Sequence, residues 1–131
     1  MSRIVIVEDS DVVRQRLEEL LGSVPGNEVV GTAEGVQEAL EVIWRTLPDA
    51  VILDLRLKDG SGMSVLELVK KTHPKMTVVV LTNHGTDEHR VKALGLGADR
   101  FLDKTADFDQ IPAAVTPRTG IRVSLTFWRY L

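Results

Sequence analysis

Five side chains of this sequence have the types needed to bind a metal ion and to handle a phosphoryl group. Glu8, Asp9 and Asp54 supply carboxylates, Thr82 supplies a hydroxyl and Lys104 supplies an ammonium group. Each stands at or just after the end of a short apolar run of the chain. If those runs are neighbouring strands of one parallel sheet, the five side chains meet at its carboxyl edge, where such sheets bind ligands.

The chemistry of this set is that of Mg²⁺-dependent phosphoryl transfer. Mg²⁺ is commonly held by one or two carboxylates, by waters and by a phosphate oxygen. Asp54 is the candidate nucleophile, because aspartyl phosphates form on such carboxylates and the transfer needs little else from the protein than positioning and neutralised charge. Lys104 would offset charge on the phosphoryl oxygens, and Thr82 would donate a hydrogen bond to them. For Glu8 and Asp9 alone, helix capping or loop solvation is an equally good explanation.

The elements that must position these residues follow from the apolar pattern. Unbroken, β-branched runs at residues 4–7, 51–53 and 78–81 predict central strands covered on both faces, and weaker runs at 29–31 and 101–102 predict flanking strands. Apolar residues at helical spacing within 13–21, 36–43, 65–69 and 91–94 predict the intervening helices, the first of them capped by Ser10 or Asp11. Alternating strands and helices predict an α/β fold, a doubly wound parallel sheet.

Length and composition set the class of protein. The chain has 131 residues, of which 44% are apolar and 27% charged, and this is typical of one globular domain. It has no cysteine and no apolar run of the about 20 residues that cross a bilayer, so we expect a cytoplasmic protein without a membrane partner. The net charge is −3, and it argues against direct binding of nucleic acid.

Four segments of the chain resemble the receiver family of two-component response regulators. They are IVIVEDS, VILDLRLKDGSG, VVVLTNHG and GADRFLDK, and they occur in the family's order within about residues 3–111. The resemblance implies a CheY-like fold with five strands in the flavodoxin-like order 2-1-3-4-5. It also implies that residues 1–115 form the receiver domain.

The resemblance assigns a role to each site residue. It makes Asp54 the phospho-acceptor, Asp9 a direct Mg²⁺ ligand and Glu8 a ligand through water, with the Arg56 carbonyl as a backbone ligand. Thr82 becomes the switch residue beside the catalytic Lys104. Phe101 resembles the aromatic residue that moves together with this threonine.

Several positions depart from the family pattern. Lys58 stands where many members have proline, four residues after the acceptor, and Thr105 replaces the proline that often follows the lysine. Arg56 and His84 occupy positions through which the family tunes access of water, and we hypothesise that they slow hydrolysis of the phosphoryl group. The alternative is that both are solvated loop residues.

Residues 116–131 form an atypical tail. Pro117 and Gly120 interrupt the expected fifth helix, which predicts that this helix is short or replaced. Apolar and polar residues then alternate, which is typical of a strand or an extended arm, and a free strand edge would allow a homodimer. A disordered terminus or a non-native sequence is an equally good explanation.

The predicted function is a phosphorylation-controlled signalling module. Its phosphoryl group would come from a sensor histidine kinase or a phosphotransfer protein, and its output would act on a downstream protein or on an output domain outside this chain. Its own catalysis would be limited to self-phosphorylation and slow autodephosphorylation. The alternatives are a phosphorylation-independent interaction module on the same fold and an aspartyl-phosphate phosphohydrolase, which would have a second aspartate where this chain has Arg56.

Overall fold

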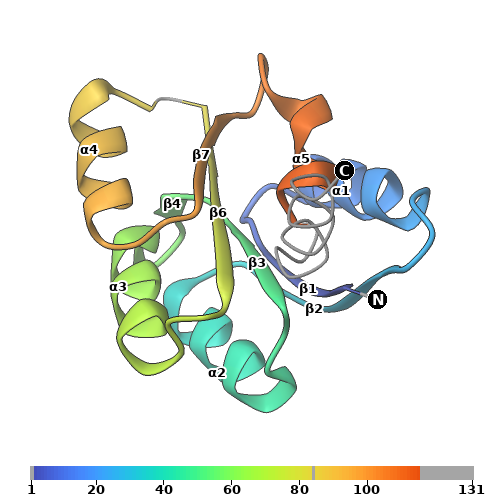
Figure 1. Cartoon of the computed structure of the whole chain (residues 1–131), viewed down its shortest axis with the longest axis horizontal. Coiled ribbons are helices and arrows are strands. Elements are labelled where there is room, and N and C mark those ends of the chain that lie inside the picture. The colour runs from blue at the N-terminus through green and yellow to red at the C-terminus, as the bar shows by residue number, and fades with distance from the viewer. Residues whose placement is uncertain (1, 84, 116–131) are drawn as a thin grey trace, which may run out of the picture.

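Helices and strands alternate along the chain in a computed structural model that describes residues 2–83 and 85–115 (Figure 1). The strands are β1 (Ser2–Val7), β2 (Asn27–Ala33), β3 (Ala50–Leu53), β4 (Arg56–Leu57), β5 (Gly60–Ser61), β6 (Thr77–Thr82) and β7 (Arg100–Asp103). The helices are α1 (Asp11–Gly22), α2 (Val36–Thr46), α3 (Gly62–Thr72), α4 (Asp87–Gly95), the 3₁₀ turn η1 (Phe108–Gln110) and α5 (Ile111–Ala114).

The central sheet has five strands in the order β2-β1-β3-β6-β7. Strand β1 pairs with both β2 and β3, β3 pairs with β6, and β6 pairs with β7, in every case in parallel. The β4–β5 pair is a separate small sheet. When the five strands of the central sheet are numbered along the chain without it, their order is 2-1-3-4-5, as predicted. The predicted fold class is therefore confirmed.

Helices cover both faces of this sheet. In Figure 1, α1 and α5 lie together on one side, and α2, α3 and α4 lie on the other. Side chains of β1 alternate between the two cores, because Ile4 and Ile6 belong to the cluster under α1 and α5 while Val5 and Val7 belong to the other. Burial on both faces explains why the central strands have no polar alternation.

N-cap side chains cap three of the helices, α1, α3 and α4. At the start of α1, Ser10 Oγ accepts a hydrogen bond from the backbone N–H of Val13 at 3.3 Å, so Ser10 and not Asp11 is the cap. Ser61 and Thr86 cap α3 and α4 in the same way. Helix α2 differs, because Gly35 at its N-cap position has no side chain with which to cap it.

Two features differ from the sequence-based expectation. Strands β4 and β5 form an antiparallel hairpin directly after the candidate acceptor, in a segment for which no strand was predicted. Helix α4 is present as predicted, but Val91 and Leu94 are 71% and 44% exposed while Ala93 is its buried residue. The apolar spacing thus predicted this helix correctly and its buried face wrongly.

Val115 is the last residue that the structure describes. The Ser2 hydroxyl donates a hydrogen bond to the Val115 carbonyl at 3.0 Å, so α5 ends beside the start of β1. The predicted tail of residues 116–131 lies outside the described residues, and the expected shortening of the fifth helix therefore stays a prediction. Among the helices that are described, none has the length and apolar character needed to cross a membrane.

Candidate functional site

The five chemistry-bearing residues meet at one edge of the sheet. Glu8 and Asp9 follow β1, Asp54 follows β3, Thr82 ends β6 and Lys104 follows β7. These four strands are consecutive in the sheet, so their carboxyl ends lie side by side. All five residues line one cavity of about 270 Å³. The convergence predicted from the sequence is therefore present.

Three carboxylates form the centre of this cavity. One oxygen from each of Glu8, Asp9 and Asp54 lies within 4.8 Å of the other two. Glu8 and Asp54 are only 1% and 5% exposed, whereas Asp9 is exposed. Negative charges held this close repel one another unless a cation offsets them. The cluster is therefore arranged to hold positive charge.

Lys104 supplies part of that positive charge. Its Nζ donates a hydrogen bond to Asp54 Oδ2 at 2.8 Å and lies 2.5 Å from Glu8 Oε1. Burial by itself would lower the pKa of Lys104, but its contacts with the Asp54 and Glu8 carboxylates outweigh burial and raise that pKa. The ammonium group is thus kept charged and is shared between two carboxylates.

Glu8 gives a test of whether the site suits Mg²⁺. Burial raises the pKa of Glu8 to about 7, against the opposing effect of its contact with Lys104. One oxygen, Oε2, accepts a hydrogen bond from the Ser10 backbone at 3.0 Å. The other, Oε1, has the Lys104 ion pair but no well-directed hydrogen-bond donor among the described residues. A buried carboxylate oxygen with spare capacity, beside two further carboxylates, fits a hard divalent cation.

The loop after β3 fixes the orientation of Asp54. The Arg56 backbone N–H donates a hydrogen bond to Asp54 Oδ1 at 3.2 Å, so each oxygen of this carboxylate has one donor. The chain then returns so closely that a Cβ on Gly62 would lie 2.1 Å from the Asp54 carbonyl oxygen. Only glycine fits at position 62, and this close approach brings the start of α3 against the acceptor.

Thr82 lies on the far side of the cavity from the acidic pair. It is buried at 4% exposure at the end of β6, and its carbonyl accepts a hydrogen bond from the Lys104 backbone at 3.1 Å. This bond ties the end of β6 to the residue after β7. The hydroxyl and the ammonium group are therefore positioned by the same pair of strands.

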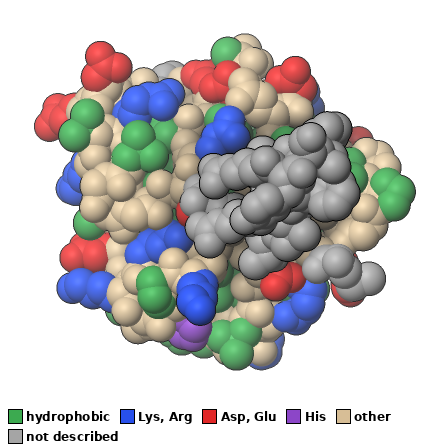
Figure 2. All heavy atoms as spheres, in the orientation of Figure 1, with side chains coloured by type: hydrophobic (Ala, Val, Ile, Leu, Met, Phe, Trp, Pro, Cys, Tyr) green, Lys and Arg blue, Asp and Glu red, His purple; other side chains and the backbone are tan. Residues whose placement is uncertain are grey.

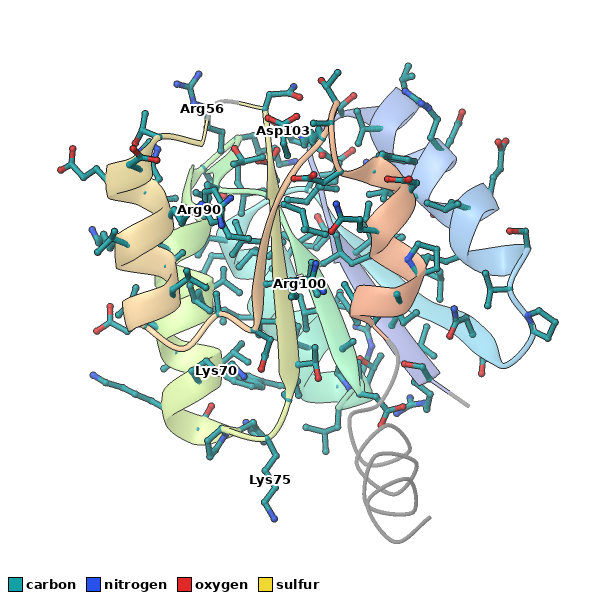
Figure 3. All side chains as sticks on the ribbon, turned by 45° about the horizontal axis from the view of Figure 1, so that its top comes forward. Arg56, Lys70, Lys75, Arg90, Arg100 and Asp103 are labelled. Carbon is teal, nitrogen blue, oxygen red and sulfur yellow. The ribbon has the colours of Figure 1, made fainter. Side chains whose placement is uncertain are left out.

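Phe101 lies two residues before the end of β7 and is buried at 7% exposure. The Arg90 guanidinium of α4 stacks over its ring, 5.0 Å from the ring centroid. Figure 3 shows Arg90 reaching from α4 toward the sheet. The aromatic ring thus contacts both the sheet and the helix that follows Thr82.

The two residues expected to tune hydrolysis have different outcomes. Arg56 is exposed, lines the cavity beside Asp54 and projects from the carboxyl edge in Figure 3. His84 lies outside the described residues. The structure thus places Arg56 beside the acceptor, and the tuning role of both residues stays a prediction.

Sequence reasoning missed a set of charged residues around the site. Arg14 of α1 donates a hydrogen bond to the Glu8 carbonyl at 3.1 Å and to Glu34 at 3.3 Å, and Lys58 pairs with the same Glu34 at 3.3 Å. Asp59 accepts a hydrogen bond from the Val36 backbone at 2.5 Å. The only signal available in the sequence was Lys58 in place of the frequent proline, because contacts between separate loops leave no periodic pattern.

Comparison with known proteins agrees with this geometry. The family model described as the response regulator receiver domain matches residues 4–116. The chain is 33% identical to the DNA-binding transcriptional activator DevR/DosR of Mycobacterium tuberculosis over 88% of this chain and 53% of that protein. It is 41% identical to a protein-glutamate methylesterase/protein-glutamine glutaminase of Xanthomonas campestris over 78% of this chain and 29% of that enzyme.

A solved structure is similar over most of its length. The signal receiver domain of the putative response regulator NarL from Mycobacterium tuberculosis superposes with a TM-score of 0.81 at 30% identity, covering 87% of this chain and 92% of that domain. The chain thus spans a receiver domain almost completely, but only about half or less of the two longer relatives.

Proposed function

The chain belongs to the response regulator receiver family, and we propose that Asp54 accepts a phosphoryl group in a Mg²⁺-dependent reaction. The observation that carries the proposal is the Lys104 ammonium group, which bridges the Asp54 and Glu8 carboxylates at 2.8 and 2.5 Å. A phosphoryl group on Asp54 would be placed beside this cation and beside the Thr82 hydroxyl. The reaction is one for which positioning and charge neutralisation supply most of the catalysis.

We assign Mg²⁺ to the carboxylate cluster. Asp9 and Asp54 would ligate the ion directly, Glu8 would act through water, and the Arg56 carbonyl would complete the protein ligands. The ion supplies charge neutralisation for the phosphoryl oxygens. Lys104 supplies a second positive charge and holds Asp54 in place, and Thr82 donates a hydrogen bond to the product.

The output of the reaction would be a change in the face formed by α4, β7 and α5. Phosphorylation adds about −1.5 to −2 charges and new acceptor oxygens beside Thr82. Movement of Thr82 toward them would shift Phe101 and, through its stacking contact, Arg90 of α4. Val91 and Leu94 are exposed on α4 and offer apolar surface that a protein partner can bind.

The proposed partners are proteins. We propose that a histidine kinase or a phosphotransfer protein supplies the phosphoryl group in the cytoplasm, and that a downstream protein or an output domain reads the signal. Figure 2 shows acidic and basic side chains interspersed over the described surface of the face it displays. Mixed charge of this kind supports a protein partner in preference to nucleic acid. We place the receiver unit at residues 1–115 and its own catalysis at self-phosphorylation and slow autodephosphorylation.

The test is phosphorylation by a small donor. Wild-type protein is incubated with Mg²⁺ and acetyl phosphate, and the phosphoprotein is separated on a phosphate-affinity gel and located by mass spectrometry. We expect modification of the wild type on Asp54 and none in Asp54→Ala. Equal modification of the two proteins would overturn the proposal. Beryllofluoride in place of acetyl phosphate should shift the amide resonances of α4 in the wild type and leave those of Asp54→Ala in place.

A further inference from the structure

Glu34, in the loop between β2 and α2, contacts one cation from helix α1 and one from the β4–β5 hairpin. Its Oε1 lies 3.3 Å from Nη1 of Arg14, and its Oε2 lies 3.3 Å from Nζ of Lys58. Arg14 belongs to the first turn of α1, and Lys58 belongs to the turn of the β4–β5 hairpin. One carboxylate therefore connects the segment after β1 with the segment after β3.

The contact on the α1 side reaches the metal-binding segment itself. Nη1 of Arg14 also donates a hydrogen bond to the Glu8 carbonyl at 3.1 Å, and Nη2 pairs with Asp11. Only 17% of the Arg14 side chain is exposed, so its guanidinium is held by packing as well as by charge. The backbone that carries Glu8 and Asp9 is thereby tied to Glu34.

The contact on the hairpin side has a second component. Asp59, next to Lys58, accepts a hydrogen bond from the Val36 backbone at 2.5 Å and another from the Gln37 backbone at 3.4 Å. It thus caps α2 from a distant part of the chain, since the N-cap Gly35 has no side chain. The hydrogen bond from Val36, foremost among several, lowers the pKa of Asp59, so this cap is a charged one.

Gly35 allows this approach. A Cβ at position 35 would lie 2.6 Å from Asp59 Oδ1 and 2.9 Å from its Cγ. Any larger residue would push the carboxylate away from the helix start. Glu34, Gly35 and the start of α2 therefore form one surface, which the hairpin after Asp54 contacts through Lys58 and Asp59.

We propose that Glu34, together with Arg14 and Lys58, is a positioning device that sets the spacing of the Mg²⁺ ligands. This inference rests on the proposed function, because the ligands it positions are Glu8 and Asp9 on one segment and Asp54 and the Arg56 carbonyl on the other. Mg²⁺ demands near-ideal octahedral geometry, so ligands from two independent loops bind it well only when their separation is fixed in advance. Lys58, which replaces the family's frequent proline, restrains the hairpin through its ion pair instead of through a fixed φ angle.

The experiment measures Mg²⁺ affinity in the absence of any phosphodonor. Mg²⁺ is titrated into metal-free protein, and the dissociation constant is obtained from amide chemical shifts. Lys58→Gln is the decisive variant, because removing a positive charge near the site should by long-range electrostatics tighten Mg²⁺ binding. The Lys58 and Glu34 side chains are 59% and 37% exposed, so solvent partly screens this pair. If the ion pair positions the ligands, Lys58→Gln instead weakens binding by about twofold to fivefold, which corresponds to about 0.4–1.0 kcal/mol.

Further variants separate positioning from charge. Glu34→Gln should weaken binding to a similar degree, and the double variant should be no weaker than either single one, because the two residues act as a unit. Lys58→Arg should retain affinity, because it keeps the positive charge that pairs with Glu34. Faster hydrogen exchange at the Val36 and Gln37 amides in Lys58→Gln would report the loosened hairpin independently of the metal.

Glu67→Gln is the matched control, because Glu67 and Lys71 form an exposed ion pair on α3 at 3.6 Å. This variant should leave Mg²⁺ affinity unchanged. Unchanged or tighter binding in Lys58→Gln would overturn the inference, and so would the absence of saturable Mg²⁺ binding in the wild type. The Lys58→Gln result leaves the acetyl phosphate assay on Asp54→Ala unaffected, so that assay tests the proposed function separately. Absence of Mg²⁺ binding in the wild type would contradict the Mg²⁺ dependence of the proposed function as well.

Discussion

Two buried lysine–aspartate pairs lie at opposite edges of the same sheet. Lys104 pairs with Asp54 at the carboxyl edge, and Lys70 pairs with Asp99 at the amino edge, each across 2.8 Å. The side chains of Lys104 and Asp54 are 9% and 6% exposed, and those of Lys70 and Asp99 are 11% and 16% exposed. By distance and burial alone, the two pairs are nearly the same.

Their surroundings make them different. Lys70 also donates to the Met76 carbonyl at 2.6 Å, and the Asp99 oxygen that it contacts accepts a second bond from the Val78 backbone at 2.8 Å. These further partners are backbone groups, whose positions are fixed by the fold. Lys104 instead lies between two carboxylates beside a cavity of about 270 Å³. We therefore expect the Lys70–Asp99 pair, whose further hydrogen bonds go to the backbone, to stabilise the fold. The Lys104–Asp54 pair faces a cavity, and we expect it to be available for chemistry.

The largest expected effect breaks the pair at the carboxyl edge. Lys104→Met removes the cation that we propose offsets charge on the phosphoryl group, and we expect the rate of phosphorylation by acetyl phosphate to fall by about 10²-fold or more. The initial rate of phosphoprotein formation measures it. Lys70→Met is the matched control and should keep a rate close to that of the wild type once folding is verified. A comparable loss of rate in both variants would contradict the distinction between the two edges.

Breaking the pair at the amino edge should cost stability instead. Lys70→Met removes an ion pair with Asp99 from a largely buried place, and we expect the free energy of unfolding to fall by about 2–4 kcal/mol. Urea denaturation followed by circular dichroism measures this change. A loss below about 0.5 kcal/mol would mean that the bond from the Val78 backbone suffices to hold Asp99.

A proton should weaken the site at the carboxyl edge. The pKa of Glu8 is raised to about 7 by burial, so the folded protein binds a proton there as the pH falls below 7. Mg²⁺ needs the ionised carboxylate, and its apparent affinity should therefore fall by about tenfold from pH 8 to pH 6. Titrations at the two pH values measure this. In Glu8→Gln affinity should be weaker throughout and its pH dependence much flatter; a full tenfold change in that variant would assign the proton to another group.

An exposed ion pair should have the smallest effect. Lys71 and Glu67 lie on the same helix as Lys70, with side chains that are 72% and 52% exposed. We expect Glu67→Gln to change the free energy of unfolding by at most about 0.5 kcal/mol, because solvent screens such pairs. Measured in the same urea series as Lys70→Met, it calibrates the contribution of burial. A larger loss would show that α3 depends on this pair.

The sequence predicted what depends on local pattern. Unbroken apolar runs marked β1, β3 and β6, because strands buried on both faces have no polar alternation. Asp54, Thr82 and Lys104 stood out because strand ends at one edge of a parallel sheet must converge. The structure brings these residues into one cavity. Their roles in phosphorylation were inferred from the chemistry of the side chains and from the family resemblance, and they remain proposals.

The sequence did not predict contacts between segments that lie far apart in the chain. Nothing in the spacing of Lys70 and Asp99 shows that they pair, since they meet only after α3, β6 and α4 are packed. The contacts of Glu34 with Arg14 and Lys58 could not be predicted for the same reason. Val91 and Leu94 were misjudged for another reason. A short helix with few apolar residues has no clear apolar stripe, so tertiary packing decides which side it buries.

The Lys70–Asp99 pair has a mechanical consequence for α4. Asp99 follows this helix closely, and its contacts with Lys70 and the Val78 backbone fix the C-terminal end of α4 to α3 and β6. The opposite end of α4 follows Thr82 across a short loop at the carboxyl edge. Helix α4 is thus held at its C-terminal end, at the amino edge of the sheet, and a rotation of the helix would take place about that end. If Asp54 is phosphorylated as proposed, the resulting displacement of α4 should be largest near Asp87 and should decline along the helix toward Gly95.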